Sequence, residues 1–168
     1  MLYVVFQKPT SLLERAMTFN GTHCHCEAVV VENGRHVTFR ALAGSPVEKA
    51  KVVTGMGDKN YWDWIKISND EANSMRAASF MNKEVGKPYN YGGYLSCPLG
   101  VSMGKIPSNS WFCSELTVAM LQKIDITGET GSLDPRITSP SRLFGALLND
   151  NFSVVNAPFG RGALTSGF

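Results

Sequence analysis

The stretch HCHCEAVVVENGRHVTFRAL, residues 23–42, contains two β-rich runs on either side of Asn33 and Gly34. An Asn-Gly pair between apolar runs is the strongest short sequence signal for a two-residue hairpin turn. With these two turn residues, Val31 lies opposite His36 in the paired strands. The stretch therefore predicts an antiparallel hairpin, around which the rest of the chain builds a sheet.

Successive side chains of a strand point to opposite faces, so the hairpin has two different surfaces. On one surface the predicted register gathers four polar residues: His25, Glu27, Thr38 and Arg40. Cys24 and Cys26 lie on the other surface, which should face the core. His23 shares the surface of His25 but lies closer to the preceding loop.

Apolar and capped segments predict the elements that flank the hairpin. Strands are expected over 2–7, 51–55, 61–67 and 152–156. Helices are expected over 10–19, 69–85 and 139–150, with a further helix that begins near Cys113. Residues 88–110 should form a loop or broken helix, and residues 126–138 a polar loop. This order predicts one α+β domain over residues 1–155, followed by a tail over 156–168.

Composition and charge exclude several classes of protein. The chain has 168 residues, 43% of them hydrophobic, and a net charge of +2. No Lys/Arg cluster favours nucleic-acid binding, and no apolar run approaches the roughly 20 residues of a transmembrane helix. The N-terminus lacks the basic segment and cleavage site of a signal peptide. We therefore expect a cytoplasmic protein whose four cysteines are thiols.

Cys113 lies in SNSWFCSELTVAML, residues 108–121, at the expected start of a helix. A helix N-terminus lowers the pKa of a thiol, and its unpaired N–H groups can stabilise an oxyanion. A free cysteine is more often a small buried hydrophobic residue. This segment alone therefore allows either a nucleophile or a core residue.

A cysteine nucleophile needs a base, and the chain offers three histidines. His36 lies beside the hairpin turn and should be solvated. His25 shares its face with polar residues that can orient an imidazole, so it is the first candidate, and His23 is the second. The HCHC run does not predict a metal site, because alternation leaves at most two ligands on each face.

Three segments together resemble a known family: THCHCEAVVVENG (22–34), GKPYNYGGY (86–94) and WFCSELTVAML (111–121). They are similar to the circularly permuted papain-like fold of the NlpC-type superfamily, and most of all to its YiiX-like branch. That branch also occurs in poxviruses and other large DNA viruses, and lecithin retinol acyltransferase-like enzymes are more distant cousins. The resemblance covers residues 2–150 and implies an antiparallel sheet packed against a helix that carries the cysteine at its N-terminus.

Carried over residue by residue, the resemblance implies Cys113 as the nucleophile and His25 as the general base, with His23 in reserve. Tyr89 and Tyr91 match the aromatic segment beside the site. Substrate-pocket roles are also expected for Trp111 and Ser114, although packing or helix capping would explain the same residues.

The residue that orients the imidazole is where this sequence departs from the family. Relatives have His, Glu or Gln on the second strand, whereas Thr38 and Arg40 stand there in this chain. An arginine would repel an imidazolium. Either the register differs, or Glu27 takes the role, or the activity is weak or lost.

The resemblance implies thiol-dependent acyl chemistry without a metal or organic cofactor. The substrate would be an amide or ester: peptide-like, γ-glutamyl or fatty acyl. The rival interpretation is a catalytically weak or inactive papain-like scaffold with a structural role. In that case the tail would join a viral or other large assembly, and a viral protein would be located in the virion.

Overall fold

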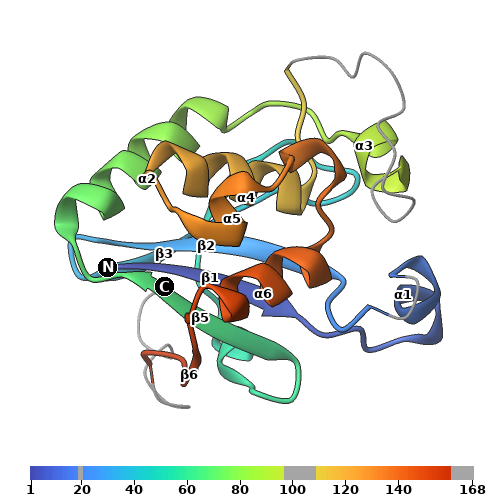
Figure 1. The fold of residues 1–168 in the computed structure, drawn as a ribbon, viewed down its shortest axis with the longest axis horizontal. Coiled ribbons are helices and arrows are strands. Elements are labelled where there is room, and N and C mark those ends of the chain that lie inside the picture. The colour runs from blue at the N-terminus through green and yellow to red at the C-terminus, as the bar shows by residue number, and fades with distance from the viewer. Residues whose placement is uncertain (19–20, 97–108, 160–168) are drawn as a thin grey trace.

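The computed structural model describes residues 1–18, 21–96 and 109–159. In this part of the chain, a six-stranded antiparallel sheet has the order β4-β3-β2-β1-β5-β6 (Figure 1). The strands are β1 Leu2–Gln7, β2 His25–Glu32, β3 Arg35–Arg40, β4 Glu48–Lys51, β5 Trp62–Ser68 and β6 Val154–Val155. The predicted α+β class is confirmed.

The hairpin β2–β3 has the predicted turn and register. Asn33 and Gly34 both have positive φ, 49° and 74°, which a two-residue turn of this type requires. Val31 pairs with His36, and Val29 pairs with Thr38. His25 and Glu27 therefore share one surface of β2, and Cys26 lies on the other surface, in the core, as alternation predicts.

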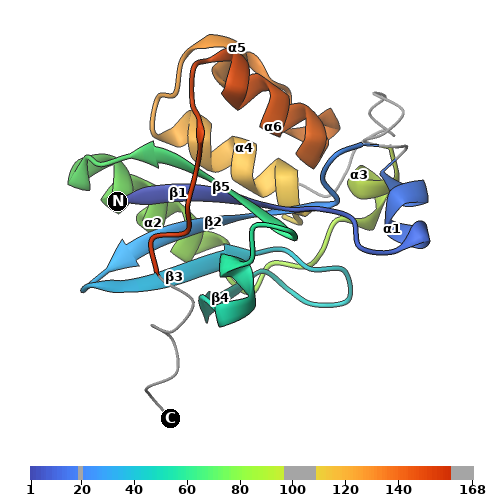
Figure 2. The ribbon, with the colours of Figure 1, turned by 90° about the horizontal axis from the view of Figure 1, so that it is seen from below.

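The helices are α1 Leu12–Met17, α2 Glu71–Glu84, α3 Tyr91–Ser96, α4 Cys113–Lys123, α5 Gly128–Ser132 and α6 Pro140–Asn149. α2 and α4 cover one face of the sheet, and α6 packs beside α4 (Figures 1 and 2). α1 and α3 lie at the same end of the molecule in both views. Among the described residues, no helix has the length and apolar character to span a membrane.

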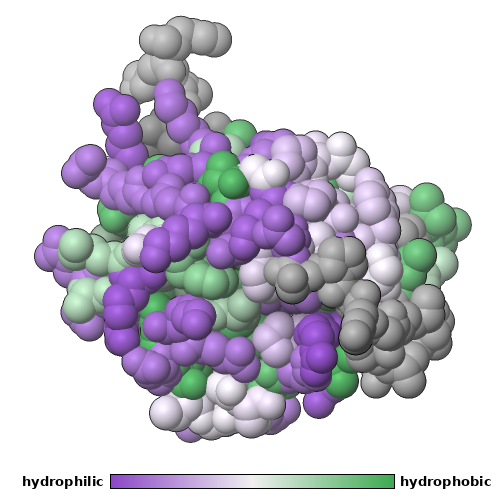
Figure 3. Space-filling view, turned by 90° about the horizontal axis from the view of Figure 1, so that it is seen from above, coloured by the Kyte–Doolittle hydropathy of each residue, from purple (hydrophilic) through white to green (hydrophobic). Residues whose placement is uncertain are grey.

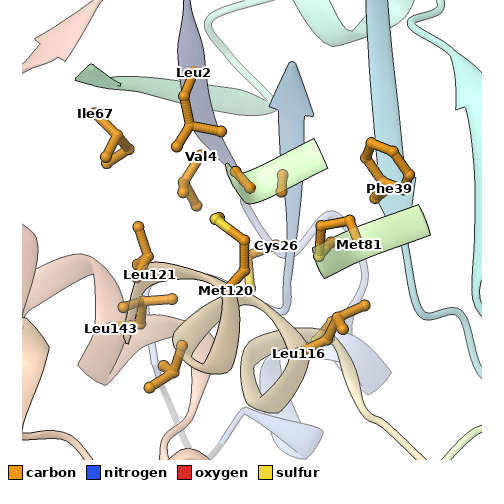
Figure 4. Packing of buried hydrophobic residues seen from close by; sticks show 14 of the residues in the cluster. Leu2, Val4, Cys26, Phe39, Ile67, Met81, Leu116, Met120, Leu121 and Leu143 are labelled. Carbon is orange, nitrogen blue, oxygen red and sulfur yellow. The ribbon is translucent and has the colours of Figure 1, made fainter. Parts of the chain in front are cut away.

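The main core lies between the sheet and the helix layer. Figure 4 shows Cys26 of β2 facing Leu116 and Met120 of α4 across this layer. α2 adds a narrow buried stripe that includes Ala77 and Met81. The rest of α2 is largely exposed, and the molecule seen from that side has a mostly hydrophilic surface (Figure 3).

A smaller apolar cluster covers part of the opposite face of the sheet. Its buried members are Tyr3, Val5, Val29, Val52, Met56 and Trp64. The chain after β6 returns to this cluster, where the ring of Phe159 packs edge-on against Trp64 at 5.2 Å. The first residues of the predicted tail thus contact the domain, and residues 160–168 lie outside the described part.

Two predicted segments differ from the structure. The strand expected over 51–55 is wrong: β4 ends at Lys51, and Thr54–Gly57 forms a 3-10 helix that places Met56 in the smaller cluster. The polar loop expected over 126–138 contains α5 and a 3-10 helix at Pro135–Ile137. The Asp150 carboxylate accepts the N–H groups of Glu129 and Thr130, a long-range cap that local sequence does not show.

Candidate active site

The start of α4 is held by buried polar contacts. Cys113 is the first residue of the helix, and its neighbour Phe112 is the N-cap. Glu115 reaches back so that its Oε2 accepts the N–H of Phe112 (3.3 Å) and the side-chain amide of Asn90 (3.0 Å). These contacts fix the backbone beside the Cys113 sulfur and join α4 to the segment that leads into α3.

Cys113 and His25 lie together at the junction of α4 with β2. The His25 ring makes hydrogen bonds to the Cys113 sulfur and, through Nε2, to Glu27 Oε1 at 3.1 Å. Cys113 is 2% exposed, and the His25 side chain is 12% exposed. The structure therefore brings together the two residues that the sequence analysis named first.

Glu27 is the carboxylate that contacts the imidazole. It lies two residues beyond His25 on β2, and therefore on the same face. Its other oxygen, Oε2, accepts a hydrogen bond of 2.5 Å from the buried hydroxyl of Thr38. Of the three residues considered for the third position, Glu27 touches His25 and Thr38 supports Glu27.

Arg40 has a different partner. Its guanidinium donates two hydrogen bonds, of 3.2 and 3.0 Å, to Glu48 Oε2 on the neighbouring strand β4. Its positive charge also helps to lower the pKa of the Glu27 carboxyl. Arg40 thus acts on the carboxylate and does not form a described hydrogen bond with His25.

The surroundings favour a charged pair of thiolate and imidazolium. A hydrogen bond from the Cys26 thiol lowers the pKa of Cys113 most, and the charge and hydrogen bond of His25 lower it further, against the effect of burial. Burial lowers the pKa of His25, but the charge of Cys113 and the hydrogen bonds to Cys113 and Glu27 outweigh it and raise the pKa to about 10. Each partner stabilises the charged form of the other.

Glu27 stays ionised beside this pair. Burial raises the pKa of its carboxyl, but the hydrogen bond and charge of His25 and the hydrogen bond of Thr38 outweigh burial and hold the pKa below its usual value. A carboxylate in contact with one ring nitrogen fixes the orientation of the imidazole. The three groups thus form a connected Cys–His–Glu arrangement.

His23, the reserve base, belongs to a separate cluster. Its buried ring contacts Thr22 Oγ1 at 2.9 Å through Nδ1 and Asp63 Oδ2 at 3.0 Å through Nε2. Phe144 packs against it with the ring centroids 4.1 Å apart. This cluster borders a cavity of about 640 Å³ that Lys8 and Arg15 also line. The structure does not bring His23 to Cys113.

The aromatic segment lies beside Cys113. Tyr89 forms an isolated parallel bridge with Trp111, and its ring lies 4.9 Å from that of Tyr91. Burial, and then the charge of Cys113, raise the pKa of the Tyr89 phenol. Tyr91 is 53% exposed, whereas the Trp111 indole donates a 2.6 Å hydrogen bond to Glu84. The Tyr89 phenol therefore lies near the Cys113 sulfur.

The structure corrects the expected positions of two residues: Ser114 is farther from the surface than expected, and Cys26 is closer to Cys113 than expected. Ser114 was expected to line a pocket, but its side chain is fully buried in α4. Alternation predicts only a core position for Cys26, yet its thiol donates to Thr117 of α4 at 3.6 Å and it has the largest effect in lowering the pKa of Cys113. Alternation places Cys26 on the core face, but it does not show which residue of α4 packs there.

No metal centre is assigned in the described ranges. Within residues 1–18, 21–96 and 109–159, no group of three or more His, Cys, Asp and Glu side chains could hold a metal ion. Cys113, His25 and Glu27 instead satisfy one another by hydrogen bonds.

Comparison with known proteins finds a structure of similar fold but no relative in sequence. No family model matches the chain, and no curated protein matches it in sequence. Among solved structures, the crystal structure of metalloprotein YiiX from Escherichia coli O157:H7 is similar, with a TM-score of 0.63 and 15% identity. The match covers 91% of this chain and 94% of that chain. The protein therefore has a YiiX-like α+β fold.

Proposed function

We propose that this protein is a cysteine-dependent hydrolase or acyltransferase that acts on an amide or ester. The observation that carries the proposal is the His25 ring, which hydrogen-bonds the Cys113 sulfur and the Glu27 carboxylate. A nucleophile, a base and an orienting group in this order are the geometric signature of nucleophilic acyl transfer. The YiiX-like fold supports the wider assignment to a permuted papain-like arrangement, in which the base precedes the nucleophile in sequence.

The reaction would begin with attack of the Cys113 thiolate on the carbonyl carbon. The first turn of a helix has N–H groups without intrahelical partners, and those of α4 would stabilise the oxyanion. His25, held as an imidazolium, would protonate the leaving amine or alcohol. Neutral His25 would then take a proton from water or another acceptor as that group attacks the acyl-thioester.

We further propose a peptide-like, γ-glutamyl or fatty acyl substrate. The aromatic side chains Tyr89 and Tyr91 would form one wall of the pocket, since Tyr89 lies close enough to Cys113 for the charge of Cys113 to raise its pKa. The name metalloprotein raises a metal site as an alternative for the structural neighbour. The donor groups described in this chain do not fit one, so no step passes through a metal.

The test is the reactivity of Cys113 with iodoacetamide between about pH 5 and 10, read by intact-protein and peptide mass spectrometry. We expect fast labelling well below pH 8.5, the usual range of a free thiol. His25→Ala should slow labelling at neutral pH, whereas His36→Ala serves as the matched histidine control. Labelling of Cys113 only at alkaline pH, unaffected by His25→Ala, would contradict the proposal. A panel of fluorogenic amides and esters would then identify the substrate class.

The low exposure of Cys113, 2%, supports a second candidate, an inactive scaffold in a viral or other assembly. In that case the tail, residues 156–168, would supply the contact. Removal of residues 160–168 should then change the oligomeric mass measured by light scattering. A monomer of unchanged mass and a reactive Cys113 would exclude this candidate.

A further inference from the structure

Cys26 is a buried thiol that the proposed reaction does not use. It lies on the core face of β2 and is 1% exposed, directly across from the start of α4. Thr117, one helical turn after Cys113, connects the two cysteines: its hydroxyl donates to the Cys113 carbonyl at 2.9 Å and accepts a hydrogen bond of 3.6 Å from the Cys26 thiol. The Cys26 thiol and N–H also lie close enough to the Cys113 sulfur to lower the pKa of Cys113.

From this contact we propose that Cys26 is a resolving cysteine, so that a peroxide converts Cys113 and Cys26 into a reversible disulfide. The inference rests on the proposed thiolate at Cys113. The proposed disulfide would be a modification site between β2 and α4. Its formation would stop the acyl chemistry, because Cys113 would no longer be a free thiolate. The natural ligand of this site is a hydroperoxide small enough to reach a buried sulfur.

The chemistry is balanced in two steps. In the first, the Cys113 thiolate attacks one oxygen of the peroxide, the O–O bond breaks, and the departing hydroxide takes the proton of His25 to become water. Cys113 is then a sulfenic acid. In the second, the Cys26 sulfur attacks the Cys113 sulfur, the S–O bond breaks, and the departing hydroxide takes the Cys26 proton. Two thiols are oxidised, and the peroxide is reduced to two waters.

The electrostatics of the pair fit this order of events. Burial, together with the hydrogen bond and charge of Cys113, raises the pKa of Cys26 well above its usual value. Cys26 therefore keeps its proton while Cys113 is the thiolate and the first target of an oxidant. A neutral sulfenic acid at Cys113 removes the negative charge that holds the Cys26 proton in place.

Cys24 provides a matched control. It lies two residues before Cys26, and its thiol donates to the carbonyl of Gln7 at 3.5 Å. Burial raises its pKa to about 11, and it makes no hydrogen bond to Cys113 in the described contacts. Cys97, the remaining cysteine, lies outside the described residues. In a Cys24→Ser, Cys97→Ser variant, Cys26 and Cys113 are the two cysteines that remain.

The experiment treats the reduced full-length protein with hydrogen peroxide near pH 7 and then blocks free thiols with N-ethylmaleimide. Peptide mapping without reductant should find a Cys26–Cys113 link in the wild type and in the Cys24→Ser, Cys97→Ser variant. Iodoacetamide labelling of Cys113 should fall roughly tenfold or more and return after dithiothreitol. Cys26→Ser keeps a hydrogen-bond donor but should form no link, and dimedone should trap its Cys113 sulfenic acid.

The two proposals fail in different ways. Fast labelling of reduced Cys113, followed on peroxide by irreversible sulfinic acid without a link to Cys26, would overturn the switch and leave the proposed nucleophile intact. A link from Cys113 to Cys24 or Cys97 would overturn it as well. Slow labelling of reduced Cys113 at neutral pH would overturn both.

Discussion

Glu27 Oε1 lies 3.1 Å from His25 Nε2, and the two residues are neighbours on one face of the same strand. The carboxylate that orients the imidazole therefore comes from β2 itself and not from β3. Thr38 on β3 contributes indirectly, through its hydrogen bond to the other oxygen of Glu27.

Glu27→Gln should reduce the turnover of an amide or ester substrate by about 10- to 100-fold, because the imidazole loses its charged orienting partner. Steady-state kinetics would show the loss in kcat. Glu48→Gln is the matched control, since Glu48 pairs with Arg40 at the sheet edge and should leave kcat unchanged. Equal effects of the two substitutions would show that Glu27 has no special role.

The pH dependence of kcat/KM should be bell-shaped with an upper limb near pH 10. The acid limb follows protonation of the Cys113 thiolate, whose pKa lies well below its usual value. The alkaline limb follows loss of the His25 proton, whose pKa is raised to about 10, because the leaving group then has no acid. A profile that rises continuously through pH 10 would contradict an imidazolium at His25.

The same His25 pKa has a consequence for stability. A histidine whose folded pKa is raised contributes stability that is complete below its unfolded pKa, about 6.5, and that disappears as the pH rises through about 10. The stability of the wild type relative to that of His25→Ala, measured by urea unfolding, should therefore decrease between these values. Parallel profiles for the two proteins would contradict the raised pKa.

Asn90→Ala should lower the free energy of unfolding by about 1–3 kcal/mol, because Glu115 and Gly93 each lose a buried hydrogen bond. Asn90 donates to Glu115 at 3.0 Å and accepts the N–H of Gly93 at 2.9 Å. Asn82→Ala on the exposed side of α2 is the control and should change stability by less than about 0.5 kcal/mol. Denaturant titration would measure both, and a neutral Asn90→Ala would refute the positioning role.

Phe159→Ala should destabilise the domain by about 1–3 kcal/mol without slowing the labelling of Cys113. The Phe159 ring packs edge-on against Trp64 and, at 5.4 Å, against His36 on the face of the sheet away from α4. Denaturation followed by tryptophan fluorescence would measure the loss. An unchanged unfolding midpoint would place the domain boundary before Phe159, at the predicted residue 155.

The sequence predicted the elements that local patterns specify. Asn33 and Gly34 define the hairpin and its register, and the cap at Asp70 with Gly86 beyond the end brackets α2. Local pattern failed where distant residues decide the structure. Asp150 caps α5 from a position 21 residues after Glu129. The 3-10 turn at Met56 depends on an apolar cluster formed by other strands.

The candidate site divides in the same way. Alternation and the helix start made Cys113, His25 and Glu27 candidates, since they depend on faces and ends of single elements. The family resemblance then implied the roles of Cys113 and His25, and Glu27 was one of three candidates for the third position, with Thr38 and Arg40. The contact of Cys26 with Cys113 and the pairing of Arg40 with Glu48 depend on how β2 meets α4 and how β4 meets β3. These packing details are set by the whole core and leave no signal in a short segment.

His25 and Glu27 are separated by one β repeat, so the pleat of the strand fixes their spacing. Only the distance from the imidazole to the Cys113 sulfur crosses from the sheet to the helix layer. A substitution in the interface between these layers, at Leu116 for example, would therefore move Cys113 relative to His25 and leave the spacing of His25 and Glu27 unchanged. Core packing can in this way tune the pKa of both Cys113 and His25, because the charge of Cys113 is the largest effect that raises the His25 pKa. The contact of His25 with Glu27, in contrast, is set within the strand.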